Sequence, residues 1–390
     1  MDKRVAKLMQ KKQPKQLTDA WFKLRRDCVT ASSAASLLIR DPGTCDRYIE
    51  LYGLKDVFKL DHKCCNPYSS KLEYFKNKVL GSKFQGNEAT FWGQKYESVV
   101  SDIYSVLNGV DIIEFGLINH SDIAWLSASP DGITPQGVMV EIKCPFRRDP
   151  DGIPPFYYYI QCQIQLEVCD LEYCDFVEYV FNEFATEEEW LDIETLDIDI
   201  FNRGLFLKIE EFDEDDFNDA KEKTVDGKGK EAEVKGKGKE AEVKGKGKEA
   251  EGNSQDFLSG LKPESIEYKY PDRKFIDDTQ GLLAWKSHWI ESVNKESPIR
   301  VSVVYYKVVK TCITRIERDR KWFEYVKPVL DREWKKVLYY RKDSNHKKLT
   351  EHETKAVCTL DPVSMDIGYT SKPKNKSTEC PMSDESESED

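Results

Sequence analysis

A charged repeat divides this chain more sharply than any other feature. Residues 227–251 repeat the unit GKGKEAEVK, in two full copies and a partial third, with no aromatic residue. Val234 and Val243 are the only bulky apolar side chains in that range. Such a stretch cannot bury enough apolar surface to offset the entropy lost when it is ordered. We therefore expect a flexible charged linker over about residues 210–258, with folded segments on both sides.

The folded segments have the patterns of a mixed α/β domain. Apolar residues recur at helical spacing from Trp92 to Leu107, which predicts a strong amphipathic helix. Shorter apolar runs predict strands at 112–118, 124–128, 138–144 and 175–181, with a second helix at 156–168 before the last of them. Beyond the linker we expect a strand at 301–310 and a long amphipathic segment at 322–338, which Pro328 should kink or begin.

This order of elements predicts an α/β fold, with a mixed central sheet flanked by helices and a disordered insertion. The late elements have the same apolar character as the early ones, so we expect one interrupted domain, with two independent domains as the alternative. The expected segments are a basic N-terminal arm (1–17), the first part of the domain (18–209), the linker (210–258), the completing strand and long helix (259–342) and a disordered acidic tail (343–390).

The sequence also indicates a cellular compartment. We find no apolar run near the roughly 18 to 20 residues that cross a bilayer, and the Lys- and Gln-rich N-terminus has no signal-peptide stretch. The 11 cysteines are an odd number without a paired CxxC framework, which favours reduced thiols over disulfides. Cys64-Cys65 and the trio Cys162, Cys169 and Cys174 could also be metal ligands. We expect an intracellular protein, in the nucleus or cytoplasm of a host cell, neither secreted nor bound to a membrane.

The net charge of −12 conflicts with nucleic-acid binding only if the charge is evenly spread. Much of the acid lies at 183–199, at 210–219 and in the tail at 384–390, whereas Lys and Arg are dense at 3–15 and 307–348. A local basic surface is therefore compatible with the sequence.

The segments SASPDGI (127–133) and VMVEIKCP (138–145) contain the candidate catalytic residues. Side chains at i and i+2 share one face of a strand, so Glu141 and Lys143 project together while Ile142 turns to the core. If the two segments pair as a hairpin, Asp131 comes beside Glu141. Alone, Pro130-Asp131-Gly132 is a common turn, and a Glu and a Lys on a strand are usually solvated. Together, two carboxylates and an ammonium suit phosphodiester hydrolysis with Mg²⁺ or Mn²⁺, which prefer oxygen ligands.

These residues resemble the PD-(D/E)XK nuclease superfamily, and within it the lambda exonuclease branch, also called the YqaJ-type viral recombinase family. Four stretches carry the resemblance, over about residues 21–181: WFKLRRDCVTAS (21–32), WGQKYE (92–97), SASPDG with VEIKCPF (127–146) and YYIQCQIQLEV (158–168). The resemblance implies a restriction-endonuclease-like fold. The stretch 54–83, the linker and the acidic tail have no counterpart in the family pattern.

The resemblance also implies roles at the reactive centre. Asp131 and Glu141 would hold Mg²⁺ or Mn²⁺, as two ions, with the Ile142 carbonyl as a third ligand. Lys143 and Gln161 would contact and activate the attacking water. Glu97 would lie near the metal without being one of its direct ligands. Without the resemblance, Glu97 is a helix-surface residue and Gln161 part of a polar helix face.

A second set of residues is implied to hold phosphate: Arg25 and Ser32 the terminal 5′ phosphate, and Ser129 the scissile one. Ser32 also lies at the start of an apolar helix, 31–39, where N–H groups favour an anion, although simple N-capping is the alternative. Arg147 and Arg148 could add contacts to the DNA backbone.

The expected function is an exonuclease that resects linear double-stranded DNA from a 5′ end and leaves 3′ overhangs for recombination or repair. An endonuclease or resolvase on the same fold, and a DNA-binding module without catalysis, are the alternatives. The expected partners are duplex DNA with free ends and a single-strand-annealing protein. The resemblance to lambda exonuclease-type proteins, which form trimers, also implies contacts with further copies of the chain.

Overall fold

The protein is described here from a computed structural model. The described residues are 1–38, 43–54, 69–81, 86–192, 203–218, 262–263, 265–292, 297–342, 345 and 349. Met1–Leu338 forms one compact unit, and Tyr339–Asp390 is assigned to a second. Residues 219–258 of the expected linker and nearly all of the expected tail lie outside the described residues.

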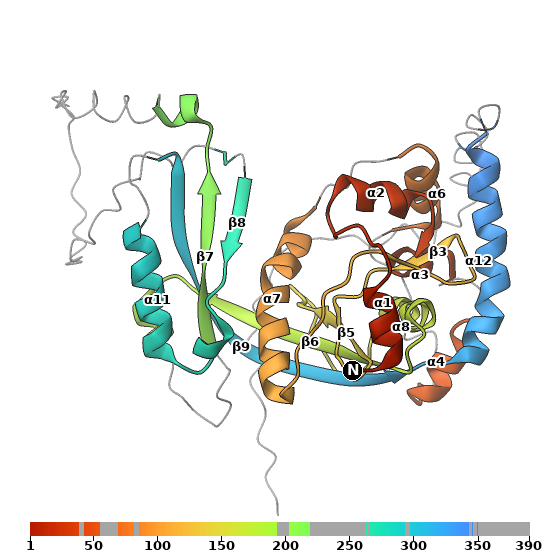
Figure 1. The fold of residues 1–390 in the computed structure, drawn as a ribbon, viewed down its shortest axis with the longest axis horizontal. Coiled ribbons are helices and arrows are strands. Elements are labelled where there is room, and N and C mark those ends of the chain that lie inside the picture. The colour runs from red at the N-terminus through yellow and green to blue at the C-terminus, as the bar shows by residue number, and fades with distance from the viewer. Residues whose placement is uncertain are drawn as a thin grey trace, which may run out of the picture. The chain divides into compact units, whose positions relative to one another are not determined.

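A six-stranded mixed sheet organises the first unit (Figure 1). Its order is β4 (Gly132–Ile133), β5 (Val138–Lys143), β6 (Tyr173–Phe184), β9 (Ile299–Glu317), β7 (Arg203–Glu211) and β8 (Ser265–Lys269). The β5–β6 pair is parallel and the other four pairs are antiparallel. A separate three-stranded sheet has the order β1 (Val29–Thr30), β3 (Leu126–Ala128) and β2 (Ile118–Asn119).

Strand β9 joins sequence-distant parts of the chain. Its C-terminal part, from Tyr305, pairs with β6, and its N-terminal part, up to Lys307, pairs with β7 (Figure 1). Strands from both sides of residues 219–261 therefore lie in one sheet. The predicted strand at 301–310 is correct but too short, because the pairing with β6 continues to Glu317.

Two long helices cover opposite faces of the sheet beside β5 (Figure 1). Helix α7 (Glu88–Asn108) buries Tyr96, Val100 and Ile103 in one apolar cluster with Ile142. It begins where Asn87 accepts a hydrogen bond from the Thr90 N–H, and it ends at Gly109, whose φ of 61° is left-handed. Helix α8 (Phe156–Cys169) lies on the other face, where Tyr158 packs against Phe176. The predicted fold class, a mixed sheet flanked by helices, is confirmed.

The remaining helices complete the described part of the chain. They are α1 (Lys3–Met9), α2 (Asp19–Arg26), α3 (Ala31–Leu38), α4 (Asp46–Leu51), α6 (Lys71–Val79), α9 (Glu187–Leu191), the 3-10 turn η3 (Arg273–Phe275), α11 (Thr279–Ser292) and α12 (Arg320–Tyr340). Among the described residues, no helix has both the length and the apolar character needed to cross a membrane. Every described cysteine is a free thiol.

Several sequence expectations are corrected. The expected linker start at residue 210 is wrong, because Glu210 lies within β7, is buried, and pairs with Arg300 and Lys208. Of the two roles expected of Pro328, beginning the long C-terminal helix is wrong, because the helix begins at Arg320, where the Asp319 side chain accepts the Trp322 N–H, and Pro328 lies inside it. The expected strand at 112–118 reduces to β2 and an isolated bridge at Ile113.

The expected basic arm, 1–17, is helical over Lys3–Met9. Val5 and Leu8 of α1 are buried, so apolar contacts hold this segment against the rest of the unit. Val5 and Leu8 are three positions apart and therefore share a helix face. The many Lys residues in this range made this short apolar face difficult to recognise from the sequence.

The register of β7 and β8 leads to a prediction about the connection between them. Glu211 pairs with Ser265, so the strand ends that residues 212–264 connect are already neighbours. Replacing 219–261 by a short Gly-Ser linker should keep the free energy of unfolding or raise it by about 1 kcal/mol, since each halving of a loop saves about 0.6 kcal/mol. Urea denaturation measures this. A loss of more than about 1 kcal/mol would show that residues 219–261 contribute contacts to the fold.

Candidate active site

The β4–β5 hairpin brings the three predicted residues together. Gly132 pairs with Val140, which places Asp131 opposite Glu141 at the open end of the hairpin. The Asp131 Oδ2 accepts a hydrogen bond of 2.7 Å from the Ile142 N–H. The Ile142 side chain enters the apolar cluster under α7, whereas Glu141 and Lys143 project to the face under α8.

Glu141 is fully buried, and its carboxylate is surrounded by donors. Lys143 forms an ion pair with its Oε1, and the Gln161 side-chain amide donates to the same oxygen at 2.5 Å. The Gln165 amide donates to Oε2 at 2.7 Å. A desolvated carboxylate needs such partners because burial without them costs several kcal/mol. Helix α8 therefore supplies two of the three side chains that donate to the Glu141 carboxylate.

The charges in this site are unbalanced. Burial raises the pKa of Asp131 well above the ordinary aspartate value, and the nearby Glu141 and Glu97 carboxylates raise it further. Burial is also the main reason for the raised pKa of Glu97, with a contribution from Glu141 and an opposing one from Lys143. Burial favours the neutral amine of Lys143, but Glu141 and Asp131 outweigh this effect and raise its pKa well above the lysine value.

The donor set fits a hard divalent cation. Three carboxylates, those of Asp131, Glu141 and Glu97, stand against the single ammonium of Lys143, so a further positive charge would relieve their repulsion. Their oxygen atoms are the ligand type that Mg²⁺ and Mn²⁺ prefer. Within the described residues, no three His, Cys, Asp or Glu side chains converge on one metal position. Asp131 and Glu141 therefore remain the predicted pair of ligands, with the Ile142 carbonyl as the predicted third.

A second polar site lies at the junction of α2 and α3. The Arg25 guanidinium donates to the Ser32 hydroxyl at 3.1 Å and stacks over the Trp21 ring at 4.2 Å. Among the described residues, no carboxylate forms an ion pair with Arg25, and burial lowers the pKa of its guanidinium. The Ser32 hydroxyl is engaged with Arg25, whereas Ser33 accepts the Thr30 N–H at the start of α3. The arrangement presents a cation and a hydroxyl to an anion.

Ser129 connects this site to the hairpin. Its hydroxyl accepts a hydrogen bond from the Trp21 indole at 3.4 Å and donates to the Gly116 carbonyl at 3.0 Å. Two residues later the chain reaches Asp131. Lys78 supports the same junction from α6, because its buried ammonium donates to the carbonyls of Arg25 and Cys28. No pattern in the sequence singles out Lys78, since these two hydrogen bonds are with backbone atoms far along the chain.

The two arginines after the hairpin have different surroundings. Arg148 pairs with the buried Glu178, whose backbone is in register with Lys143, so its guanidinium contributes to the fold. The Arg147 side chain is 76% exposed and lies 3.9 Å from Glu88. Of the two arginines, Arg147 is therefore the more exposed to solvent.

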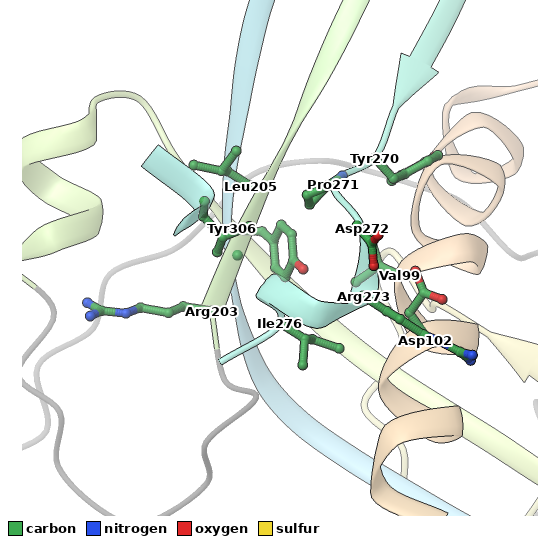
Figure 2. A pocket seen from close by; sticks show the side chains of 12 residues that line it. Val99, Asp102, Arg203, Leu205, Tyr270, Pro271, Asp272, Arg273, Ile276 and Tyr306 are labelled. Carbon is green, nitrogen blue, oxygen red and sulfur yellow. The ribbon is translucent and has the colours of Figure 1, made fainter. Parts of the chain in front are cut away.

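A separate hollow lies between α7 and the start of β7 and contains none of the predicted site residues. Figure 2 shows Asp102 on α7 and Tyr306 on β9 among the side chains that line it. Its arginines are already engaged, Arg273 with Asp111 and Arg203 with Thr279. The hairpin site remains the stronger candidate.

Comparison with known proteins identifies one family match and several relatives. Residues 20–172 match the family model described as the YqaJ-like viral recombinase domain, which confirms the resemblance for that part of the chain. An uncharacterized protein of Acanthamoeba polyphaga mimivirus is 26% identical over 353 residues, which cover 85% of this chain and 54% of the relative. The chain thus spans about half the length of this curated relative.

Two solved structures are also similar. The alkaline exonuclease from Laribacter hongkongensis is 26% identical, with a TM-score of 0.30, over 42% of this chain and 74% of that one. A phage-related exonuclease from Haemophilus somnus is 13% identical, with a TM-score of 0.33, over 80% of this chain and 93% of that one.

The two predicted phosphate-site serines should differ in their effect on stability. Ser129→Ala leaves the Trp21 indole and the Gly116 carbonyl without their partner, so the free energy of unfolding should fall by about 1–2 kcal/mol. Ser32→Ala removes an exposed hydroxyl and should cost less than about 0.5 kcal/mol. Urea denaturation of both variants measures the difference. Equal losses would contradict the connecting role of Ser129.

Proposed function

We propose that this protein is a metal-dependent DNA exonuclease that degrades one strand of linear duplex DNA from the 5′ end and leaves a 3′ overhang. The observation that carries the proposal is the set of Asp131, Glu141 and Lys143 on one hairpin, with Gln161 donating to Glu141. The family match over residues 20–172 covers all four residues and supports the same chemistry.

The proposed cofactor is Mg²⁺ or Mn²⁺, as two ions held by Asp131, Glu141 and the Ile142 carbonyl. When bound, it would polarise the phosphoryl group and make a water more acidic. Lys143 remains protonated in the described site because its pKa is raised, so we assign it the donation of hydrogen bonds to the reacting oxygens. Gln161 would orient the water, and Glu97 would add negative charge at the edge of the site.

The proposed direction of digestion rests on Arg25 and Ser32. An arginine that pairs with no carboxylate among the described residues, and that lies beside a hydroxyl, is suited to a terminal phosphate. The contacts from Arg25 through Trp21 to Ser129 would hold that phosphate at a fixed position relative to Asp131. An endonuclease would use the same hairpin without needing this second site, and a non-catalytic module would not need Lys143.

The test is digestion of linear duplex DNA labelled at one end, in the presence of Mg²⁺. We expect digestion of 5′-phosphorylated DNA, slower digestion of 5′-hydroxyl DNA, and none of closed circular DNA. Arg25→Gln should remove the preference for the phosphate. Lys143→Ala should bind the duplex as before and lose cleavage by a factor of at least about 100. Cutting of the closed circle would move the protein to the endonuclease alternative, and no cutting at all would favour a binding module.

The raised pKa values of Asp131 and Glu97 predict a pH-dependent effect of the cation. In the cation-free protein these carboxyls hold protons more tightly than in the unfolded chain, so stability falls as pH rises through their raised pKa values. A cation must displace those protons, and its affinity should rise up to about tenfold per pH unit for each proton displaced. Mn²⁺ should therefore raise the melting temperature more at about pH 8.5 than at about pH 5.5.

Differential scanning fluorimetry measures this shift, and Glu141→Gln provides the control. That variant removes one carboxylate ligand and should reduce the Mn²⁺-induced shift at both pH values. An equal shift at the two pH values in the natural sequence would contradict the linkage between protonation and the cation.

A further inference from the structure

Gln165, which belongs to the second half of α8, contacts the carboxylate oxygen of Glu141 that Gln161 does not contact. The two glutamines are one helical turn apart and donate to different oxygens of the same carboxylate. We propose that Gln165 is a positioning residue that fixes the Glu141 carboxylate and thereby sets the affinity of the site for its divalent cation. This inference rests on the proposed function.

The orientation of the Gln165 amide follows from its partner. A carboxylate only accepts hydrogen bonds, so the Gln165 NH₂ group must face Glu141, at 2.7 Å from Oε2. The opposite atom, Gln165 Oε1, is buried and accepts no hydrogen bond from the described residues. Leaving a buried acceptor in this state costs on the order of 1–3 kcal/mol. The fold therefore retains a polar side chain here whose one hydrogen bond among the described residues is with Glu141.

Gln163, on the same helix, shows what a buried glutamine with a structural role looks like. Its Nε2 donates to the Glu317 carbonyl at 2.7 Å, and its Oε1 accepts the Asp319 N–H at 2.8 Å. Both atoms thus bond the backbone between β9 and α12. Gln163 is 1% exposed and Gln165 is 0% exposed, so the two differ in partners and not in burial.

The division of donors around Glu141 gives Gln165 a distinct task. Oε1 accepts both Lys143 and Gln161, the two groups proposed to act on the water and the phosphate. When either group turns toward substrate, Oε1 loses a donor. Gln165, which donates to Oε2, is not assigned a contact with the water or the phosphate. It can therefore hold the plane of the carboxylate throughout the reaction. Partners that orient a metal ligand in this way typically contribute 10–100-fold to metal affinity.

The experiment compares Gln165→Met with Gln163→Met in the full chain. Methionine is close to glutamine in size and cannot donate to a carboxylate. Calorimetric titration with Mn²⁺ should show an affinity at least about tenfold weaker for Gln165→Met. The Mn²⁺ concentration for half-maximal digestion of linear duplex should rise by the same factor. Gln163→Met should lower the melting temperature and leave both Mn²⁺ measurements unchanged.

The outcomes separate this inference from the proposed function. If the natural sequence binds no Mn²⁺, the proposed function fails. If it binds Mn²⁺ and Gln165→Met binds equally well, the positioning role of Gln165 is overturned. An equal loss of affinity in Gln163→Met would likewise overturn it, because the effect would then be a general one of α8. Should Gln165→Met not fold, as judged by circular dichroism, Gln165→Asn replaces it, since the shorter side chain cannot reach Glu141 and the same loss is expected.

Discussion

The burial of the Glu141 carboxylate is the constraint on which the site depends. A charge without solvent is tolerated only when donors surround it, and here they come from Lys143 on the same strand and from Gln161 and Gln165 on α8. The two glutamine hydrogen bonds link α8 to β5. The hydrogen bonds that join α8 to the sheet are therefore also the ones that orient Glu141 in the site.

The two polar sites are connected by direct contacts. Ser32 accepts from Arg25, Arg25 stacks on Trp21, and Trp21 donates to Ser129. The Gly116 carbonyl fixes the Ser129 hydroxyl, and the chain continues from Ser129 to the hairpin. Such a series would hold the proposed terminal phosphate at the α2–α3 junction at a set distance from the carboxylates. A protein that removes nucleotides from an end needs this kind of fixed spacing.

The part of the chain beyond residue 172 contributes the framework more than the chemistry. Strand β9 pairs with β6 on the side away from β5. Its last residue, Glu317, has the backbone carbonyl that accepts a hydrogen bond from Gln163. The pairs Arg315–Asp175 and Arg318–Glu167 link β9 to β6 and α8. Every side chain assigned to the reaction lies within residues 20–172, so the later strands and α12 act by holding β6 and α8 in place.

The sequence by itself determined the features that depend on near neighbours. The period of two on β5 placed Glu141 and Lys143 together and Ile142 in the core, and helical periodicity located α7 and α8. The strand pairs of β7, β8 and β9, and the use of Ser129 as a link, join residues far apart in the chain, and no local pattern specifies them. The roles of Gln163 and Gln165 were decided by tertiary structure alone. Helix α8 is buried on nearly all sides, so only its packing shows which amide faces Glu141 and which faces the backbone.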